Sequence, residues 1–297
     1  SRGLGDVYKR QVLIGSVSRL YMSNKCLLIA DHKSVDKQIH IFNKNDFSYL
    51  TSIGNFGEGP EEITVMGCLA IDEAHHQLYV SDHAKQKIFS YDMDSVMVDS
   101  LYKPQVKTAM NETLFPSEYQ YINDTLSIAV LIKPTSTSTF NQFLGRWNMN
   151  TGEMIPMKYT HPDIQKKRIT FAASEKAGIY VECYTRHDLM TICSLDGELL
   201  YNIYGPDWDG GNGNKLQSFG TVMIGNDKIF VSYCGEDYAR DSFPTKILVF
   251  DLEGNYLKTL ETGYKISDCC YDSFNNRIIL SLNDVVQFAY LDIDGII

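Results

Sequence analysis

Short, mostly apolar segments recur along the chain at nearly equal intervals. Each is a triplet rich in β-branched, leucine or aromatic residues, as in Leu27-Leu28-Ile29. The six triplets occupy residues 27–29, 78–80, 126–128, 179–181, 229–231 and 278–280, so their third residues are 51, 48, 53, 50 and 49 positions apart. Repetition at a period of about 50 residues is typical of arrays of small β-sheets.

Each triplet belongs to a unit of four predicted strands. A second strand-like run follows every triplet, at residues 38–42, 87–91, 143–147, 190–194, 247–250 and 286–291. Turns rich in Asp, Asn and Gly end most of these runs, and such residues tolerate the positive φ angles of tight turns. One more strand is expected after each turn and another before each triplet. Apolar residues do not recur at helical spacing over a long window, so no helix is predicted.

The pattern predicts an all-β protein, a six-bladed β-propeller with four antiparallel strands per blade. The triplets are near-continuous apolar runs because neighbouring blades cover both faces of an inner strand. A β-sandwich is the alternative, but it does not explain six units of near-constant length. The polar run at 133–139 predicts a long surface hairpin loop in the third unit. The sixth unit stops soon after Gly295, so three strands of its own are expected there unless residues 12–20 supply a fourth.

Residues 1–11 are predicted to be non-native. Residues 6–11 read Asp-Val-Tyr-Lys-Arg-Gln, which resembles one translation frame of a transposon-end adapter used in shotgun sequencing libraries. Such a segment indicates a metagenomic assembly, and a short polar native N-terminus is the alternative. Setting the segment aside leaves residues 12–297 as a single six-bladed propeller domain.

Composition narrows the classes of partner. The chain has 297 residues, of which 44% are hydrophobic, so it can bury a full core. The net charge of −10 repels a phosphate backbone, so no nucleic acid is expected as a partner. No apolar run approaches the roughly 18 residues of a membrane-spanning helix. Seven cysteines without a CxxC pair indicate no disulfide framework. Cys183 and Cys193 flank a hairpin and are a candidate pair, whereas the adjacent Cys269 and Cys270 point to opposite faces of a strand and are poor partners for each other.

One connecting loop carries a family resemblance. Residues 53–63 read Ile-Gly-Asn-Phe-Gly-Glu-Gly-Pro-Glu-Glu-Ile, which resembles the loop of NHL-like propellers. Segments 203–208, 231–236 and 247–255 extend the resemblance. With this loop, they make the chain similar to the TolB-like six-bladed β-propeller proteins of anaerobic gut bacteria. It departs from them at Glu62-Ile63, where an aromatic residue is more usual. The resemblance implies an exported protein of the cell envelope, periplasmic or anchored to the outer membrane as a lipoprotein, and it brings no catalytic residues.

Acidic residues form the candidate site. Glu61 and Glu62 lie in the loop between the first two units, while Asp31, Asp82 and Glu236 follow their triplets at similar offsets. Carboxylates gathered at one mouth of the central channel would repel one another and favour a cation, for which Ca²⁺ is the suitable ion. The alternative is that the loop is a rigid connector, whose glycines and Pro60 only shape the backbone.

The remaining motifs do not match the residue patterns of known metal or catalytic sites. The loop at 207–214 lacks the EF-hand residues at its fifth, sixth and twelfth positions, so a flexible surface loop is expected. The seven histidines show no metal-ligand spacing and are interpreted as solvated turn residues, although hairpin geometry could bring His76 and His83 within several ångströms of each other. No nucleophile elbow, P-loop or Rossmann fingerprint is present in the sequence.

Two functional hypotheses follow. The first is a non-catalytic binding propeller of the cell envelope, a monomer without a cofactor that holds a protein, a peptide or a glycan. The alternative is a metal-dependent hydrolase or lyase with a Ca²⁺-type site in the central channel. Three or more carboxylates converging within about 5 Å would favour the metal site, and scattered acids would favour the binding module.

Overall fold

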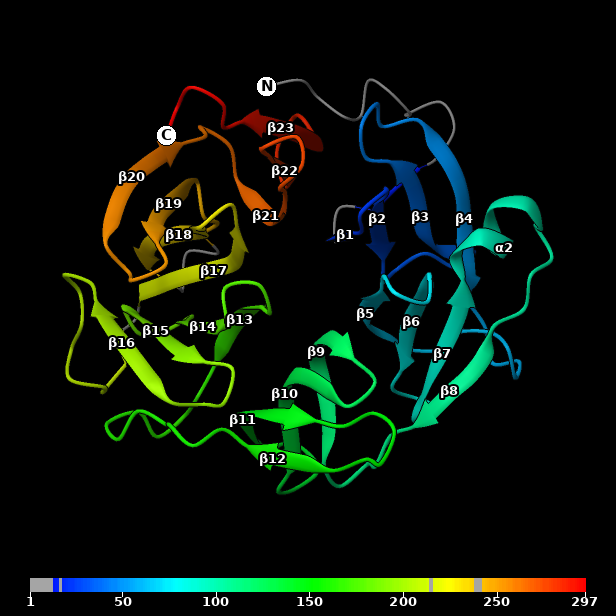
Figure 1. Cartoon of the computed structure of the whole chain (residues 1–297), viewed down its shortest axis with the longest axis horizontal. Coiled ribbons are helices and arrows are strands. Elements are labelled where there is room, and N and C mark those ends of the chain that lie inside the picture. The colour runs from blue at the N-terminus through cyan, green and yellow to red at the C-terminus, as the bar shows by residue number, and fades with distance from the viewer. Residues whose placement is uncertain (1–12, 16–17, 214–215, 238–241) are drawn as a thin grey trace. The chain divides into compact units, whose positions relative to one another are not determined.

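The computed structural model describes residues 13–15, 18–213, 216–237 and 242–297. The predicted adapter segment, residues 1–11, lies outside the described residues. The described chain forms two compact units, which meet in sequence at Pro156 and Met157. We call them the first half and the second half. Each holds three antiparallel sheets that the chain completes one after another (Figure 1).

The first half contains three four-stranded sheets. Its strands are β1 (Ser18–Met22), β2 (Cys26–Asp31), β3 (Lys37–Asn43) and β4 (Tyr49–Asn55); β5 (Met66–Asp72), β6 (Gln77–Asp82), β7 (Lys87–Asp92) and β8 (Gln105–Ala109); and β9 (Phe115–Asn123), β10 (Leu126–Pro134), β11 (Phe140–Trp147) and β12 (Met154–Pro156).

The second half contains two four-stranded sheets and one three-stranded sheet. Its strands are β13 (Ile169–Ser174), β14 (Ile179–Tyr184), β15 (Leu189–Ser194) and β16 (Leu199–Tyr204); β17 (Leu216–Gly225), β18 (Lys228–Asp237), β19 (Lys246–Asp251) and β20 (Tyr256–Glu261); and β21 (Ile266–Asp272), β22 (Arg277–Leu282) and β23 (Phe288–Asp292).

The six sheets are the blades of a six-bladed β-propeller, as the repeat predicts. Every apolar triplet lies in the second strand of its blade, and all six residues of β2 and of β14 are buried. The last blade has three strands, and residues 18–22 belong to β1 of the first blade instead of completing it. The third-blade loop between β10 and β11 is exposed, as expected.

Apolar side chains pack between neighbouring blades of each half. In the first half, one cluster joins the first two blades and another joins the second and third. In the second half, two corresponding clusters join the fourth blade to the fifth and the fifth to the sixth. The first strands of adjacent blades lie close together, as β5 and β9 do. The core therefore lies between the faces of neighbouring blades. Side chains in the turns and connectors are the ones that can contact a ligand.

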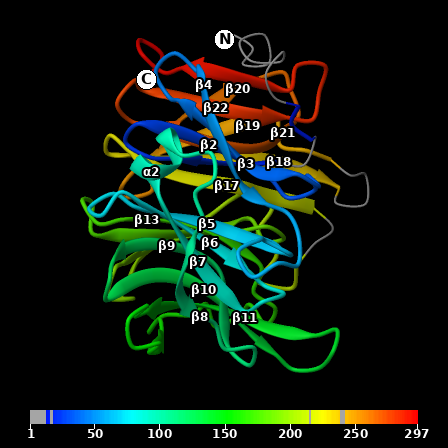
Figure 2. The ribbon, with the colours of Figure 1, turned by 90° about the vertical axis from the view of Figure 1, so that its right-hand side faces the viewer.

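The prediction that the chain has no helix is wrong. The described residues include α2 (Met93–Val98), inserted between β7 and β8 (Figure 1). Asp92 caps it by accepting the Ser95 N–H at 2.9 Å, and Val96 is its buried residue. Six residues are too few to produce a helical repeat of apolar positions. Figure 2 shows α2 beside β4 of the preceding blade. No helix among the described residues is long and apolar enough to cross a membrane.

Candidate functional site

The predicted acidic residues fall at the ends of strands and in a connector. Asp31 ends β2 and Asp82 ends β6, while Glu61 and Glu62 lie in the connector from β4 to β5. Because the strands of a blade are antiparallel, the turns after its second strand lie at the same end as its connectors to other blades. These four residues therefore share one end of the first half. Glu236 lies on β18 of the second half and is exposed.

Asp82 is fully buried and binds backbone. Its Oδ2 accepts the Thr64 N–H at 2.8 Å, and its Oδ1 accepts the N–H groups of Val65 at 3.1 Å and Ala84 at 3.0 Å. Lys85 adds its own N–H and an ammonium 3.4 Å from Oδ2. Burial by itself would raise the pKa of this carboxyl, but the N–H donors and Lys85 outweigh it and lower the pKa. Asp82 thus fastens the incoming connector to its blade.

Asp31 and Glu62 are also occupied by backbone groups. Asp31 accepts the N–H of Gly15 at 2.8 Å and that of Lys33 at 3.2 Å. Glu62 accepts the Gly59 N–H at 2.9 Å. A Cβ built on Gly57 or Gly59 would lie 2.4 or 2.6 Å from the Glu62 carboxylate, so only glycine allows this approach. These contacts support the connector interpretation of the loop.

The five acids do not form a compact group. Across the described part of the chain, the only set of three or more Asp, Glu, His or Cys ligand atoms within 4.8 Å of one another is a different set. Glu61 is paired with Lys103, whose Nζ lies 3.5 Å from Oε2. A shared binding role for Asp31, Asp82, Glu61, Glu62 and Glu236, with Ca²⁺ as its ion, stays a prediction.

A cavity of about 490 Å³ opens beside α2, at the other end of the first two blades. Leu28 and Leu78, both buried, contribute its apolar floor, and Ile71 lines it as well. Met93 and Met97, one helical turn apart on α2, provide a wall of flexible side chains. The helix that the sequence did not predict is therefore what encloses this space.

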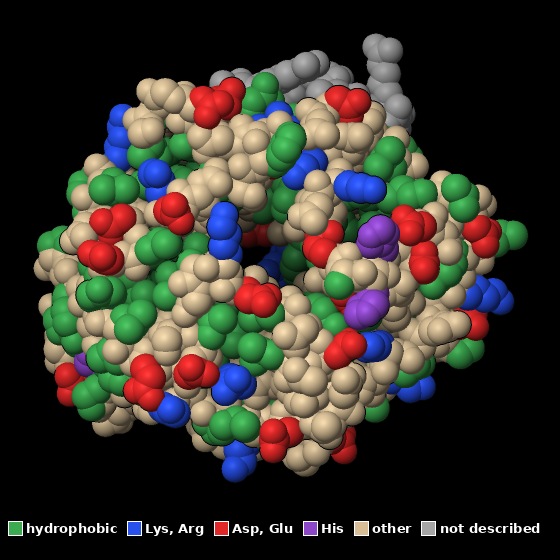
Figure 3. All heavy atoms as spheres, in the orientation of Figure 1, with side chains coloured by type: hydrophobic (Ala, Val, Ile, Leu, Met, Phe, Trp, Pro, Cys, Tyr) green, Lys and Arg blue, Asp and Glu red, His purple; other side chains and the backbone are tan. Residues whose placement is uncertain are grey.

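Polar groups surround the same cavity. They come from turns, from the ends of two strands and from the helix: Asn24, Lys25, Asn43, Glu73, His76, Gln77 and Asp94. Glu73 accepts the Asn24 N–H at 2.7 Å and so ties the two blades together. His76 Nδ1 lies 3.1 Å from Asp94, which links the β5–β6 turn to α2. Figure 3 shows histidine and acidic side chains close together over these blades on the face turned to the viewer. An apolar floor with a few polar groups around it is the usual form of a small-molecule site.

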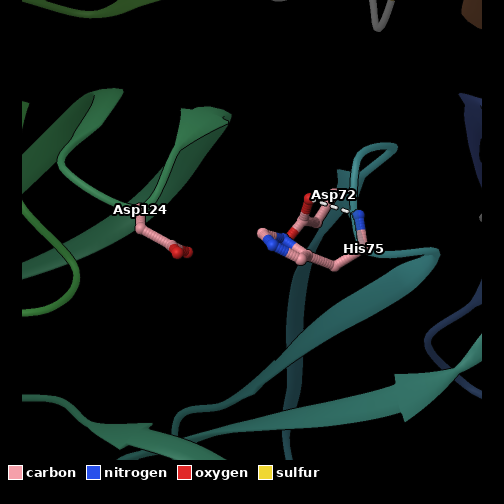
Figure 4. A group of neighbouring side chains, drawn as sticks. All are labelled: Asp72, His75 and Asp124. Carbon is pink, nitrogen blue, oxygen red and sulfur yellow. Dashed lines mark hydrogen bonds and ion pairs between the residues drawn. The ribbon is translucent and has the colours of Figure 1, made fainter.

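Asp72, His75 and Asp124 are the set with ligand atoms within 4.8 Å (Figure 4). Asp72 ends β5 and is buried, His75 lies in the next turn, and Asp124 reaches toward them from the β9–β10 turn. Tyr79 donates to Asp72 Oδ2 at 2.7 Å, and Tyr121 donates to Asp124. Hydroxyls that orient carboxylates in this way also support the ligands of metal sites. One imidazole and two carboxylates would suit a transition metal better than Ca²⁺.

Other side chains of the protein already contact the two carboxylates of this group. His75 Nδ1 lies 2.8 Å from Asp72, and Lys107 Nζ lies 3.7 Å from Asp124. Burial alone would raise the pKa of Asp72, but its bonds from Tyr79 and His75 lower it. Asp272 holds the corresponding place on β21 and accepts the Asn275 N–H, as Asp72 accepts that of His75. The Asp at this position therefore shapes the turn. Sequence reasoning missed the group because Asp124 is distant in sequence.

Only some of the histidines are the solvated turn residues that the sequence predicts. His76 precedes β6 and His83 follows it, so a strand of six residues, about 20 Å long, separates them. The prediction that they lie within several ångströms is wrong. His75 and His76 have mostly exposed side chains, as expected for turn residues. His40, His161 and His187 are buried instead.

The loop at 207–214 is anchored by an aromatic contact. Trp208 packs against His161 and His187, with ring centroids 5.3 and 6.1 Å apart. The Asp207 N–H donates to Asp188 Oδ2 at 3.0 Å, while Asn214 lies outside the described residues. The described part of the loop is thus held to the fourth blade, contrary to the expectation of a flexible loop.

All seven cysteines are buried and unpaired. Cys183 lies opposite Met190 and Cys193 opposite Tyr180, so these two cysteines do not face each other across the hairpin. Burial raises the pKa of every thiol: Cys26, Cys68, Cys183, Cys193, Cys234, Cys269 and Cys270. Thiols in this state are poor nucleophiles.

Comparisons with known proteins agree on the fold. The family model DUF5128, described as a 6-bladed beta-propeller, matches residues 9–143. A structure from the DUF4221 family of Bacteroides vulgatus has a TM-score of 0.62 at 10% identity, covering 93% of this chain and 92% of that one. A Bacteroides fragilis protein named for predicted export has a TM-score of 0.57 at 14% identity, covering 91% and 80%.

A gluconolactonase of Xanthomonas campestris is similar to the same degree. Its TM-score is 0.57 at 14% identity, and the alignment covers 90% of this chain and 82% of that one. No curated protein matches the sequence. At identities this low the likeness is one of architecture, and activities do not transfer with it. The blades, their order and these comparisons together make the chain a six-bladed β-propeller.

Proposed function

We propose that this protein is a non-catalytic binding module and that α2 builds its binding region. The observation that carries the proposal is the 490 Å³ cavity beside α2, with its floor of Leu28 and Leu78 and its polar surround. Small-molecule sites in proteins commonly have about 300–1,000 Å³ and this mixture of apolar and polar lining. The helix is also a departure from the blade pattern, and such insertions are where propellers and other scaffolds place function.

The chemistry of the described side chains is consistent with binding. The buried thiols are unsuited to nucleophilic attack. The carboxylates of Asp31 and Asp82 already accept hydrogen bonds from backbone N–H groups. The cell envelope is the proposed location, because a structural neighbour is named for export and the sequence resembles envelope propellers. The proposed ligands remain a protein segment, a peptide or a glycan.

Filling the cavity is expected to weaken the binding of an apolar dye. The dye 8-anilinonaphthalene-1-sulfonate fluoresces when it enters an apolar cavity of a folded protein. We expect Met97→Trp to weaken dye binding at least tenfold, because the indole occupies the space between α2 and Ile71. Fluorescence titration of the folded protein measures the effect.

Val98→Trp is the matched control. Val98 is the next residue on the same helix and is 88% exposed, so an indole there stays in solvent. Dye binding that is equally strong in the wild type and in Met97→Trp, or that is lost equally in both variants, would count against this cavity as the binding site.

The alternative, a metal-dependent hydrolase or lyase, has a separate test. Among the described residues, Asp72, His75 and Asp124 are the set able to offer three ligands at one place. Turnover of a panel of lactones and esters, lost on addition of a chelator and in Asp72→Asn, would favour the enzyme over the binding module. We expect no turnover above the rate of a heat-denatured sample.

A further inference from the structure

Half-buried and exposed apolar side chains line the cavity beside α2, so a ligand can reach them. Ile71 of β5 and Met93 and Met97 of α2 are half-buried, and Leu50 of β4 is 42% exposed. Three elements therefore present apolar surface to one space of about 490 Å³. Methionine side chains are flexible and adjust to the shape of what they contact. An apolar chain suits this lining better than a sugar, whose hydroxyls would lose water without gaining enough partners.

The acidic groups around the cavity already have partners. The Asp94 carboxylate lies 3.1 Å from His76 Nδ1, and Glu73 accepts the Asn24 N–H at 2.7 Å. Asp72 also lines the cavity, but it is buried and accepts the hydroxyl of a tyrosine. These carboxylates are therefore held by the protein itself, and a cationic ligand would have to compete for them.

Lysines offset the same acids. Lys25 lines the cavity, and Lys44 lies close to it, since both act on the Cys26 thiol of the lining. Burial is the main reason that the pKa of this thiol is raised; among nearby charges, Glu73 raises it further and the two lysines lower it. Charges of both signs thus surround the opening. Salt screens exposed charges over about 8–10 Å, so they give an ion of either sign little advantage.

Asn43 offers a ligand a hydrogen-bond donor at the edge of the cavity. The residue is half-buried, and its Oδ1 accepts the Asn45 N–H at 2.8 Å, which fixes the orientation of the amide. Its Nδ2 donates to no group among the described residues, so it can donate to a ligand. Gln77 differs, because its amide nitrogen and its amide oxygen both bind within the protein. The matching end of a ligand is therefore an acceptor such as a carbonyl oxygen.

We propose that the cavity beside α2 binds a neutral amphiphile, an apolar chain whose polar end is the carbonyl group of an ester or an amide. The chain contacts Ile71, Met93 and Met97, and the carbonyl oxygen accepts a hydrogen bond from Asn43 Nδ2. The proposal rests on the proposed function, because it takes this cavity as the binding site, and it names the chemical class of the ligand.

Three ligands with similar chains and different ends test the class. Methyl octanoate carries a neutral ester, octanoate a carboxylate and octyltrimethylammonium a cation, and each is titrated by calorimetry below the concentration at which it forms micelles. Methyl octanoate is expected to bind at least tenfold more tightly than either ion. The reason is that an ion loses hydration at an apolar cavity without gaining a matched counter-charge.

Substitution of Asn43 tests the donor. Asn43→Ala is expected to weaken methyl octanoate about tenfold, the effect of one well-placed hydrogen bond, and to leave octyltrimethylammonium unchanged. Asn43→Asp keeps an oxygen for the Asn45 N–H and removes the donating group, so it is expected to weaken the ester without loosening the turn. Asn148→Ala is the matched control. Asn148 is half-buried and accepts the Asn150 N–H at 2.9 Å in the corresponding turn of the third blade, away from the cavity, so ester binding is expected to stay unchanged.

The ligand class and the cavity can fail separately. Ions that bind as tightly as the ester, or ester binding that survives both Asn43→Ala and Asn43→Asp, would overturn the class. Failure of all three ligands to bind a chain that still takes up the dye would overturn it too. Dye uptake that is absent from the wild type, or that Met97→Trp leaves unchanged, counts instead against the cavity as the binding site.

Discussion

Replacing Glu182 with glutamine is expected to lower the free energy of unfolding by about 3–5 kcal/mol. Glu182 lies on β14 with its side chain 2% exposed, and Lys167 Nζ lies 2.8 Å from one carboxylate oxygen and 3.0 Å from the other. The Lys167 side chain is itself only 10% exposed. The substitution therefore leaves a buried ammonium without its counter-charge. Urea denaturation followed by circular dichroism measures the loss.

A second substitution identifies the cause. Lys167→Met in the Glu182→Gln background is expected to recover most of the lost stability, because replacing both charges removes the unpaired one. Glu198→Gln is the matched control, since it breaks a pair with Lys158 in which both side chains are more than 60% exposed. An exposed pair contributes at most about 1 kcal/mol. A loss in Glu182→Gln no larger than in Glu198→Gln would show that the buried charge is relieved in another way.

Replacing Asp82 with alanine is expected to cost a similar amount, about 3–5 kcal/mol at neutral pH. The fully buried carboxylate accepts N–H groups from the connector and from its own turn, and the substitution leaves these donors and the Lys85 ammonium without it. Asp94→Ala is the control, because the Asp94 side chain is 78% exposed and forms only a surface pair with His76. The same urea experiment compares the two variants.

The loss at Asp82 is expected to depend on pH. The folded chain lowers the pKa of Asp82 below the ordinary value of 3.8. A carboxyl with a lowered folded pKa stabilises the protein above its unfolded pKa, and this stabilisation is lost as the pH falls through the folded pKa. The gap between wild type and Asp82→Ala is therefore expected to be full at pH 7 and to narrow below about pH 4. A gap that stays constant down to pH 3 would contradict the role given to the charged form.

Asp82 shows which part of the candidate site the sequence predicted and which part it did not. Its position two residues after an apolar triplet was visible in the sequence, and Asp31 has the same offset from its own triplet. The sequence did not show what the carboxylate binds. Its partners Thr64 and Val65 come from the connector, so they depend on where the connector crosses the blade. Glu61 differs from Asp82 because its side chain is exposed and pairs with Lys103 at the surface, whereas the buried Asp82 binds backbone N–H groups.

The cavity beside α2 and the group formed by Asp72, His75 and Asp124 were equally invisible in the sequence. Helix α2 spans six residues and has no helical repeat to detect, yet its side chains form one wall of the 490 Å³ cavity. Asp124 reaches Asp72 and His75 only because the turns of neighbouring blades come together. His76 and His83 are close in sequence and far apart in space, because the extended strand β6 separates them.

The sequence by itself determined the blades. Six apolar triplets at a near-constant spacing, each flanked by strand-like runs and turn residues, admit one way of burying the second strand of every unit on both faces, and that is to cover it with neighbouring blades. Only the tertiary structure decided which polar groups form hydrogen bonds within the protein and which ones line a cavity. Hydrogen bonds and cavities form between residues that are distant along the chain, so their partners follow from how turns, connectors and α2 pack together and leave no local pattern in the sequence.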